Sequence, residues 1–146
     1  MTTDEPGYTA PDILLLGAEH VRAYQETGGE TGYLWNGVPT LLLTTTGRRS
    51  GQPRTTPLIF ARDGDDYLLI ASTGGAPKHP LWYLNLQAQP QAEIQVRDRK
   101  IAVTARTAEG DERTRLWKVA ATTWPNYDVY QTRTDRVIPV VVLTPN

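Results

Sequence analysis

Residues 40–61 of the chain read TLLLTTTGRRSGQPRTTPLIFA. Two runs rich in threonine, leucine and isoleucine, at 40–46 and 55–61, flank a basic connection at 47–53 that contains glycine and proline. Such residues favour extended strands, whereas glycine and proline favour turns. The segment therefore predicts a β-hairpin with a positively charged connection.

Further strands and turns follow this hairpin. Asp63-Gly64-Asp65 predicts a turn into the next strand, and the charged residues 98–100 predict the turn of a second hairpin. The strands predicted from composition and from alternation of apolar and polar residues are 67–72, 92–96, 101–105 and 137–143.

Helical patterns occupy much of the remaining chain. Asp12 is placed to cap a first helix, which Gly28 and Gly29 end. Further helices are predicted at 80–88 and 109–122, and Pro125 can open a short one.

The order of these elements predicts the fold class. Consecutive hairpins exclude a doubly wound parallel sheet, because parallel neighbours need helical crossovers between successive strands. The sequence instead predicts an α+β fold, a small and mostly antiparallel barrel with packed helices. A length of 146 residues suits a single domain, here a helical segment at 1–30 followed by the barrel at 31–146.

Composition excludes several functional classes. Cysteine is absent, so the chain cannot build a disulfide, an iron–sulfur cluster or a cysteine nucleophile. A net charge of −1 argues against a nucleic-acid binder. Residues 1–11 lack the features of a signal peptide, and no apolar run is long enough to span a membrane. We expect a cytoplasmic protein without stable membrane insertion.

The hairpin connection is the first candidate site. No acidic residue occurs from Thr31 to Arg62, and Arg48, Arg49 and Arg54 lie together in this stretch. Guanidinium groups bind phosphate and carboxylate, and glycines allow close approach of the backbone, so we expect an anion site. Neither a P-loop nor a G-x-G-x-x-G motif is present. The alternative is a solvated turn.

A second glycine-rich loop, 72–78, leads into His79 and a helix, where negative charge or a polarised carbonyl is favoured. Core packing is the alternative reading of Trp82 and Leu86, which have helical spacing. His79 is either a base or, more ordinarily, a surface or capping residue. The only other histidine is His20, so no metal site is predicted.

Trp124, Tyr127 and Tyr130 form the third candidate. Their spacing of three places them along one ridge of a short helix. An aromatic ridge can hold a flat substrate, and a tyrosine hydroxyl can protonate it, although core packing accounts for the spacing equally well.

Taken together, residues 42–54, residues 78–85 and the segments Thr134-Asp135-Arg136 and Ile138-Pro139 resemble the deazaflavin-dependent nitroreductase family of actinobacteria. The resemblance extends from about residue 31 to the C-terminus. It implies a split β-barrel, similar to FMN-binding barrels, and the cofactor F420. An enzyme of this kind transfers a hydride from reduced deazaflavin to a planar, electron-poor quinone, nitroaromatic or activated olefin.

The resemblance also implies roles for particular residues. Those expected to bind the cofactor are Arg48, Arg49, Ser50, Arg54, Thr55, Thr56, Pro57, Leu58, Ile59, Ile70, Ala71, Ser72, Thr73, Lys78, Leu81, Trp82, Tyr83, Leu84 and Asn85. The expected substrate contacts are Trp124, Tyr127 and Tyr130. The candidate catalytic residues, as proton donors, are Tyr130, Ser72 and Tyr127.

Two departures from the family pattern bear on the choice of substrate. Trp124 stands where tyrosine is common, and Thr73 stands where better-known members carry lysine, so the resemblance does not decide whether the protein acts on bicyclic nitroimidazoles. The membrane association of some relatives is also not carried over, because the N-terminal apolar face is short, and only a peripheral contact is left open. Split-barrel relatives often form homodimers.

Two rival functions remain at the level of the sequence. A non-catalytic F420 carrier or storage protein predicts cofactor binding without turnover. An FMN-binding split-barrel protein predicts a yellow protein, but FMN has no oligoglutamate carboxylates to occupy three arginines.

Overall fold

The structure is a computed structural model and describes residue 8 and residues 17–146. Helices and strands alternate in the order expected from the sequence, with two short strands added. The elements are α1 (Gly17–Thr27), β1 (Leu34–Trp35), β2 (Val38–Thr46), β3 (Pro53–Ile59), β4 (Ala61–Asp63), β5 (Asp66–Ile70), the 3-10 turn η1 (Thr73–Gly75), α2 (Leu81–Ala88), β6 (Gln91–Val96), β7 (Arg99–Thr107), α3 (Gly110–Thr123), α4 (Asn126–Thr132) and β8 (Val140–Pro145).

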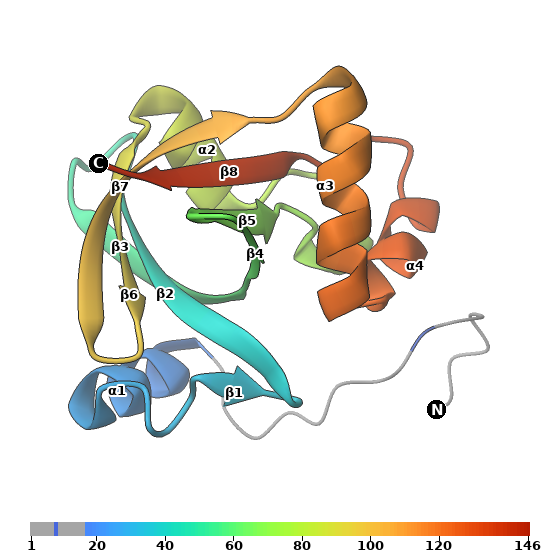
Figure 1. Cartoon of the computed structure of the whole chain (residues 1–146). Helices are drawn as coiled ribbons and strands as arrows, with labels where there is room; N and C mark the ends of the chain where they lie inside the picture. Colours follow the sequence, from blue (N-terminus) through green and yellow to red (C-terminus); the bar gives the residue numbers. More distant parts are fainter. Residues whose placement is uncertain (1–7, 9–16) are drawn as a thin grey trace.

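The strands form a curled sheet, with helices packed around it (Figure 1). Its order is β1-β2-β6-β7-β8-β5-β4, and β3 pairs with β2. Every pairing is antiparallel. This architecture confirms the prediction of an α+β split β-barrel, since antiparallel neighbours need only short connections.

The long hairpin predicted within residues 40–61 is confirmed. β2 and β3 pair from Thr40 opposite Ile59 to Thr46 opposite Pro53, so the basic connection lies at the hairpin's end. The predicted run 55–61 is nevertheless divided, because β3 ends at Ile59 and β4 begins at Ala61. Together with β5, β4 forms the hairpin predicted around Asp63-Gly64-Asp65.

Several other boundaries differ from the predictions. β2 and β3 each begin two residues earlier than predicted, at Val38 and Pro53, and β7 extends over Arg99–Thr107 rather than 101–105. The turn of the second hairpin is Arg97-Asp98 rather than 98–100, with Arg97 at a φ of 57° and Arg99 already in β7. The strand predicted at 67–72 ends at Ile70. The last strand begins at Val140 rather than 137, after Pro139, which has no backbone N–H to donate to a ladder.

The helices follow the predicted pattern closely. α2 and α3 begin and end within one residue of expectation, and Pro125 directly precedes the first residue of α4, as predicted. α1 ends before Gly28 and Gly29, whose φ values of 60° and 82° stop a right-handed helix. The expected cap at Asp12 lies outside the described residues.

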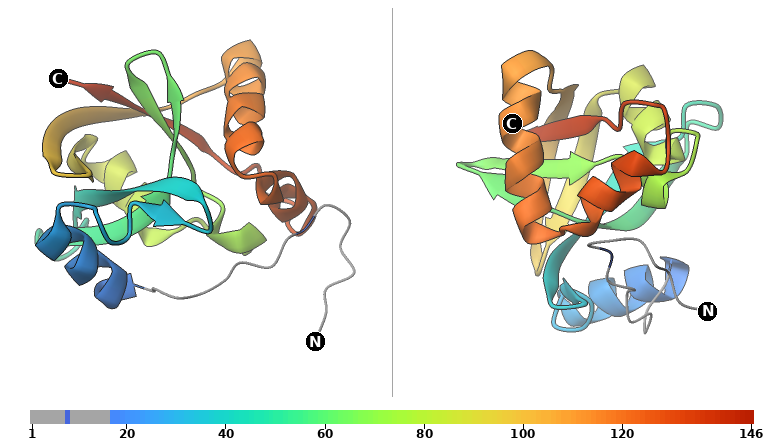
Figure 2. Two further views of the ribbon diagram at one scale, coloured as in Figure 1. Left: turned by 60° about the horizontal axis from the view of Figure 1, so that its bottom comes forward. Right: turned by 90° about the vertical axis from the view of Figure 1, so that its right-hand side faces the viewer.

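Two apolar cores support the sheet from different sides. One fills the barrel and includes Leu41, Leu69, Tyr83 and Ile94. The other lies between the sheet and α3 and α4, and includes Leu116, Trp124, Tyr127 and Tyr130. Figures 1 and 2 show α1 at one side of the sheet, and α3 with α4 at another. The predicted ridge is only partly confirmed: Tyr127 and Tyr130 lie on α4, whereas Trp124 precedes that helix, directly after the end of α3. All three side chains are nevertheless buried together in this second core.

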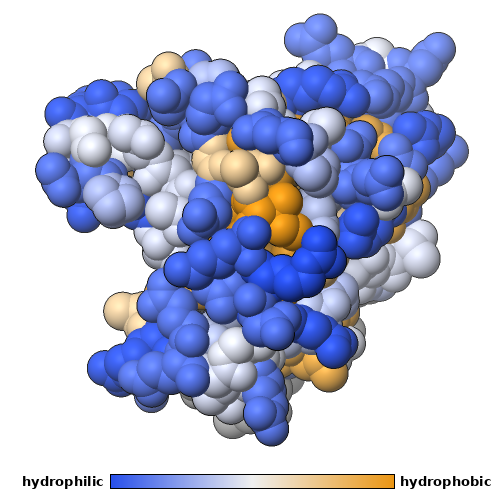
Figure 3. Space-filling model, turned by 60° about the vertical axis from the view of Figure 1, so that its left-hand side comes forward, coloured by the Kyte–Doolittle hydropathy of each residue, from blue (hydrophilic) through white to orange (hydrophobic). Residues whose placement is uncertain are grey.

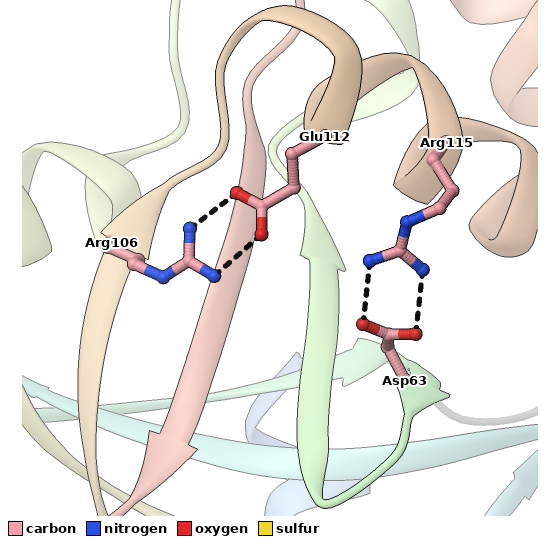
Figure 4. Close-up of polar contacts among 4 residues, drawn as sticks. All are labelled: Asp63, Arg106, Glu112 and Arg115. Atoms are coloured by element: carbon pink, nitrogen blue, oxygen red, sulfur yellow. Dashed lines mark hydrogen bonds and ion pairs between the residues drawn. The ribbon is translucent and has the colours of Figure 1, made fainter.

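Two bidentate ion pairs join α3 to the sheet (Figure 4). Arg106 of β7 binds both carboxylate oxygens of Glu112 at 2.6 and 2.9 Å. Arg115 binds Asp63 of β4 in the same manner at 2.9 and 3.1 Å. These pairs are partly exposed and therefore contribute little stability, although they connect α3 to β7 and β4.

The surface in Figure 3 is mainly hydrophilic, with a small hydrophobic area near its centre. Among residues 17–146, no helix is both long enough and apolar enough to cross a membrane.

Candidate functional site

Two cavities of different character meet beside the loop that follows β5. The aromatic cavity, about 440 Å³, includes Trp35, Ile70, Trp124, Tyr127 and Tyr130 in its wall. The basic cavity, about 590 Å³, is lined by the hairpin connection and the start of α2. Both are bordered by Thr56, Thr73, Pro80 and Trp82, so the two cavities adjoin one another.

The basic cavity has an uncompensated positive charge. Arg48, Arg49 and Arg54 line it and are all exposed. The ion pairs of the described residues involve other arginines, so none of these three has a carboxylate partner within 17–146. Free guanidinium groups at one end of a cavity form a site for an anion.

The connection that carries these arginines is tightly folded. Gly47 N–H donates to the carbonyl of Gln52, and Gly51 N–H donates back to the carbonyl of Gly47, both at 2.8 Å. A Cβ on Gly47 would lie 2.6 Å from the Ser50 hydroxyl oxygen, so only glycine fits there without a shift. The fold of the loop, rather than a helix, presents the arginines.

Asn85 joins α2 to the base of this loop. Its side-chain oxygen accepts a hydrogen bond from the Arg48 backbone nitrogen at 3.1 Å. Its side-chain nitrogen donates to the Thr45 hydroxyl, also at 3.1 Å. Asn85 is only 7% exposed, so these bonds form away from water and are costly to leave unmade.

Tyr130 and Ser72 both bring a hydroxyl group to the aromatic cavity, and the contacts of the Tyr130 hydroxyl suit it to proton donation. Trp124 Nε1 donates to the Tyr130 hydroxyl at 3.4 Å, so the Tyr130 oxygen is an acceptor there and its own hydrogen remains to be donated. Burial, with a smaller contribution from Tyr130, raises the pKa of Tyr127. Tyr127 is therefore a neutral wall of the cavity at physiological pH.

The loop 71–76 lies where the cavities meet. Ser72 and Gly74 line the aromatic cavity, and Thr73 lines both. Ser72 is buried, whereas Thr73 is exposed. The loop therefore presents a hydroxyl and backbone groups at the junction.

His79 follows this loop and is held neutral. Arg136 Nη1 lies 3.1 Å from His79 Nδ1, and a guanidinium can only donate, so Nδ1 accepts and the proton lies on Nε2. Desolvation, and then the charge of Arg136, lower the pKa of His79. This contact makes His79 part of the loop's support.

Most of the residues expected at the site line one of the two cavities. Those at the aromatic cavity are Thr56, Pro57, Leu58, Ile59, Ile70, Ser72, Thr73, Trp82, Trp124, Tyr127 and Tyr130. Those at the basic cavity are Arg48, Arg49, Ser50, Arg54, Thr56, Thr73, Leu81, Trp82 and Asn85.

Five expected residues lie apart from both linings. Tyr83 is buried in the barrel core and bonds to the Thr107 hydroxyl at 2.8 Å. Ala71 is also buried there, and Thr55 bonds to Thr44. Leu84 is half-buried and Lys78 is exposed. Leu86 packs in the core, as the alternative interpretation predicted, and Trp82 both packs against that core and lines the two cavities.

Sequence reasoning missed several residues of the walls. Trp35 and Pro80 were not singled out, although Trp35 packs 5.8 Å from Trp124 between ring centroids. The ring centroids of Tyr8 and Tyr130 lie 6.4 Å apart. Trp35 lies in a strand of two residues, which is too short for an alternating pattern to show which side chains face the interior. The local sequence therefore does not identify Trp35 as a residue of the site.

The adjoining cavities suit one elongated ligand with an anionic tail and a planar head. The arginines can bind the tail, and Thr73, Pro80 and Trp82 connect it to a cavity walled by aromatic rings. A deazaflavin with a phosphate and glutamate tail has this shape and charge. Within the described residues, no group of histidine, aspartate or glutamate side chains is arranged to hold a metal ion.

Comparisons with known proteins agree with this chemistry. The family model described as F420H(2)-dependent quinone reductase matches residues 16–145. The chain is 47% identical over 129 residues to an F420H(2)-dependent quinone reductase of Mycobacterium tuberculosis, covering 86% of this chain and 87% of that protein.

Solved structures agree as well. An F420-H2 dependent reductase is 45% identical, with a TM-score of 0.67, over 72% of this chain and 93% of that one. A domain-swapped dimer is 40% identical, with a TM-score of 0.71, over 84% and 92%. The chain belongs to the F420H(2)-dependent quinone reductase family and is an oxidoreductase that uses coenzyme F420.

Proposed function

We propose that the protein reduces quinones with reduced F420, holding the cofactor tail in the basic cavity and the quinone in the aromatic cavity. The observation that carries this proposal is that the two cavities adjoin and share Thr56, Thr73, Pro80 and Trp82 in their walls. One ligand can thereby bind at the arginines and reach the aromatic wall.

Arg48, Arg49 and Arg54 are assigned to the phosphate and carboxylates of the tail. Charge-assisted hydrogen bonds from guanidinium groups are among the stronger polar contacts in proteins. Ser50 adds a hydroxyl, which also accepts from Gln52 N–H at 3.1 Å and so helps to shape the loop. Asn85 acts on the tail through the loop, because its polar atoms are bonded to Arg48 and Thr45.

The ring is assigned to the junction of the cavities. Ile70, Trp82 and Pro80 offer apolar surface there, and Ser72 and Thr73 offer polar groups. Reduced F420 supplies a hydride from C5 of its deazaflavin ring. The contribution of the chain is to orient the ring and the acceptor, and to exclude water from the space between them.

The acceptor is assigned to the space between Trp35, Trp124, Tyr127 and Tyr130. Aromatic walls favour flat molecules, which include quinones, nitroaromatics and activated olefins. Tyr130 is the preferred proton donor, because its oxygen accepts from Trp124 and leaves its hydrogen available. Ser72 is the competing donor, and the variants Tyr130→Phe and Ser72→Ala distinguish the two.

We also infer that the protein is a cytoplasmic homodimer. The absence of cysteine is compatible with a reducing compartment, and a solved structure 40% identical to the chain is a domain-swapped dimer. Light scattering measures the mass of the assembly directly, and a monomer at micromolar concentration contradicts the inference.

The test of the function is a titration of purified protein with F420 and reduced F420, followed by decay of the reduced form with menadione. Saturable binding and decay that requires both protein and menadione support the proposal. Binding without decay for a series of quinones, nitroaromatics and enones indicates a carrier. Absence of binding contradicts the assignment of the two cavities.

A further inference from the structure

Arg136 makes an unusual set of contacts with the loop 71–76. It lies between α4 and β8 in the segment TDRVIP at 134–139. Its Nε donates to the carbonyl of Ala76 at 2.8 Å, Nη1 to that of Ala71 at 3.1 Å and Nη2 to that of Ser72 at 2.8 Å. These partners, like His79, are uncharged, so the guanidinium serves to hold backbone carbonyls.

The loop needs such support because its own conformation is strained. Thr73, Gly74 and Gly75 have consecutive φ values of 45°, 64° and 87°. A β-branched residue at positive φ is unfavourable, and such residues persist where the surroundings hold them. Within the loop, only short turns are formed, from Gly75 N–H to the carbonyl of Ser72 and from Ala76 N–H to that of Thr73.

The other side of the loop rests on the end of α4. A Cβ on Gly75 would lie 2.6 Å from the Tyr130 carbonyl oxygen, which shows how closely the two backbones approach. Arg133 Nη1 donates to the carbonyl of Gly74 at 3.0 Å. The loop is thus enclosed between Arg136 and the helix that carries Tyr130.

The Ser72 carbonyl accepts two hydrogen bonds, from Gly75 N–H at 2.9 Å and from Arg136 Nη2 at 2.8 Å, and together they hold the direction of the Ser72–Thr73 peptide group. In a planar trans peptide, the N–H points away from the carbonyl of the preceding residue. With the Ser72 carbonyl bound to Arg136, the Thr73 N–H points to the opposite side. It has no acceptor among residues 17–146, and Thr73 borders both cavities.

We propose that Arg136 is a positioning residue: it holds the Ser72–Thr73 peptide so that the Thr73 N–H donates a hydrogen bond to the reduced ring at the junction of the cavities. This inference rests on the proposed function. Reduced deazaflavins readily lose a proton from the pyrimidine part of the ring, where the negative charge then resides. A hydrogen-bond donor directed at this negative charge strengthens binding of the reduced cofactor more than binding of the oxidised cofactor.

The test compares Arg136→Gln with Arg115→Gln, a variant that loses the same charge at an exposed pair on α3, remote from the loop. Amide hydrogen exchange of the cofactor-free protein reports on the loop itself. Exchange at Gly75 and Ala76 is expected to accelerate at least about ten-fold in Arg136→Gln and not in Arg115→Gln.

The dissociation constants of oxidised and reduced F420 test whether the Thr73 N–H donates a hydrogen bond to the reduced ring. Arg136→Gln should weaken binding of the reduced form by about five-fold more than that of the oxidised form, whereas a general loss of structure weakens both equally. Arg136→Lys keeps the positive charge but cannot donate to all three carbonyls, so it should have the same effects as Arg136→Gln. The lysine variant replaces the glutamine variant in both measurements if the glutamine variant does not fold.

Unchanged exchange in a folded variant overturns the positioning role, and an unchanged ratio of the two dissociation constants overturns the donor role. If the wild-type protein binds neither form of F420, the proposed function fails and the donor role fails with it. The exchange measurement still decides whether Arg136 holds the loop.

Discussion

The side-chain oxygen of Asn85 accepts a hydrogen bond from the backbone nitrogen of Arg48 at 3.1 Å, although 37 residues separate them in the chain. The bond connects the middle of α2 to the first arginine of the hairpin connection. The shape of the basic cavity therefore depends on a buried amide that the anionic tail is not expected to touch. The role of the loop in binding the tail can therefore be tested by a substitution at Asn85, with all three arginines kept.

Asn85→Ala is expected to weaken binding of F420 by about 1–2 kcal/mol, because it leaves the Arg48 N–H and the Thr45 hydroxyl without their partner. A deazaflavin that lacks the phosphate and glutamate tail should bind with unchanged affinity. Isothermal titration with both ligands checks this. Equal losses for the two ligands point instead to damage at the junction.

Tyr130→Phe is expected to lower quinone turnover by about 100-fold and to leave the dissociation constant of F420 unchanged, because only the proton donor is lost. Tyr127→Phe is the matched control, since burial raises the pKa of Tyr127 and keeps its proton in place. Stopped-flow oxidation of reduced F420 measures both. Similar rates for the two variants would show that Tyr130 is not the proton donor, and would favour Ser72 in that role.

Gly75→Ala is expected to destabilise the protein by about 2 kcal/mol or more, because φ is 87° and the added Cβ meets the Tyr130 carbonyl oxygen at 2.6 Å. Gly74→Ala has a φ of 64° but open space around the new Cβ, so about 1 kcal/mol is expected. Urea denaturation of the two variants provides the comparison. Equal stabilities contradict the close approach of the loop to α4.

The stability of the protein is expected to depend on the protonation of His79. Its folded-state pKa lies below the ordinary value of about 6.5, so the unfolded chain binds its proton more readily. The contribution of neutral His79 is complete above that value and is lost as pH falls through the lower, folded-state pKa.

His79→Gln keeps an acceptor for Arg136 but does not titrate. The decline in the free energy of unfolding between about pH 7.5 and 5.5 should therefore be smaller in this variant than in the wild-type protein. Denaturant titrations at several pH values measure the two slopes. Identical slopes show that His79 gains its proton equally in both states.

The hairpins were predictable because their signals are local. Alternating side chains at 92–96 and 101–105, and the glycine-rich turn at 63–65, depend on neighbours in the chain. The break between β3 and β4 was not predictable, since the apolar run continues through Phe60 and Ala61 without a turn residue.

The candidate site was predictable only in part, for a similar reason. The acid-free stretch around Arg48 and Arg54 marks one cavity by charge alone. In α2, by contrast, Trp82 lines both cavities while Tyr83 enters the core, and a helix of eight residues has too little periodicity to separate the two. The contacts of Arg136 depend on a loop some 60 residues away.

In the proposed function, one F420 molecule occupies both cavities, with its tail at the arginines. The most direct measurement is the dissociation constant of F420 for the wild-type protein and for Arg54→Ala, repeated with the tail-less deazaflavin. Loss of a charge-assisted contact should cost about 1.5–3 kcal/mol, which raises the dissociation constant of F420 about 10- to 100-fold and leaves that of the tail-less compound unchanged. An unchanged dissociation constant for F420, or an equal change for both ligands, contradicts the claim.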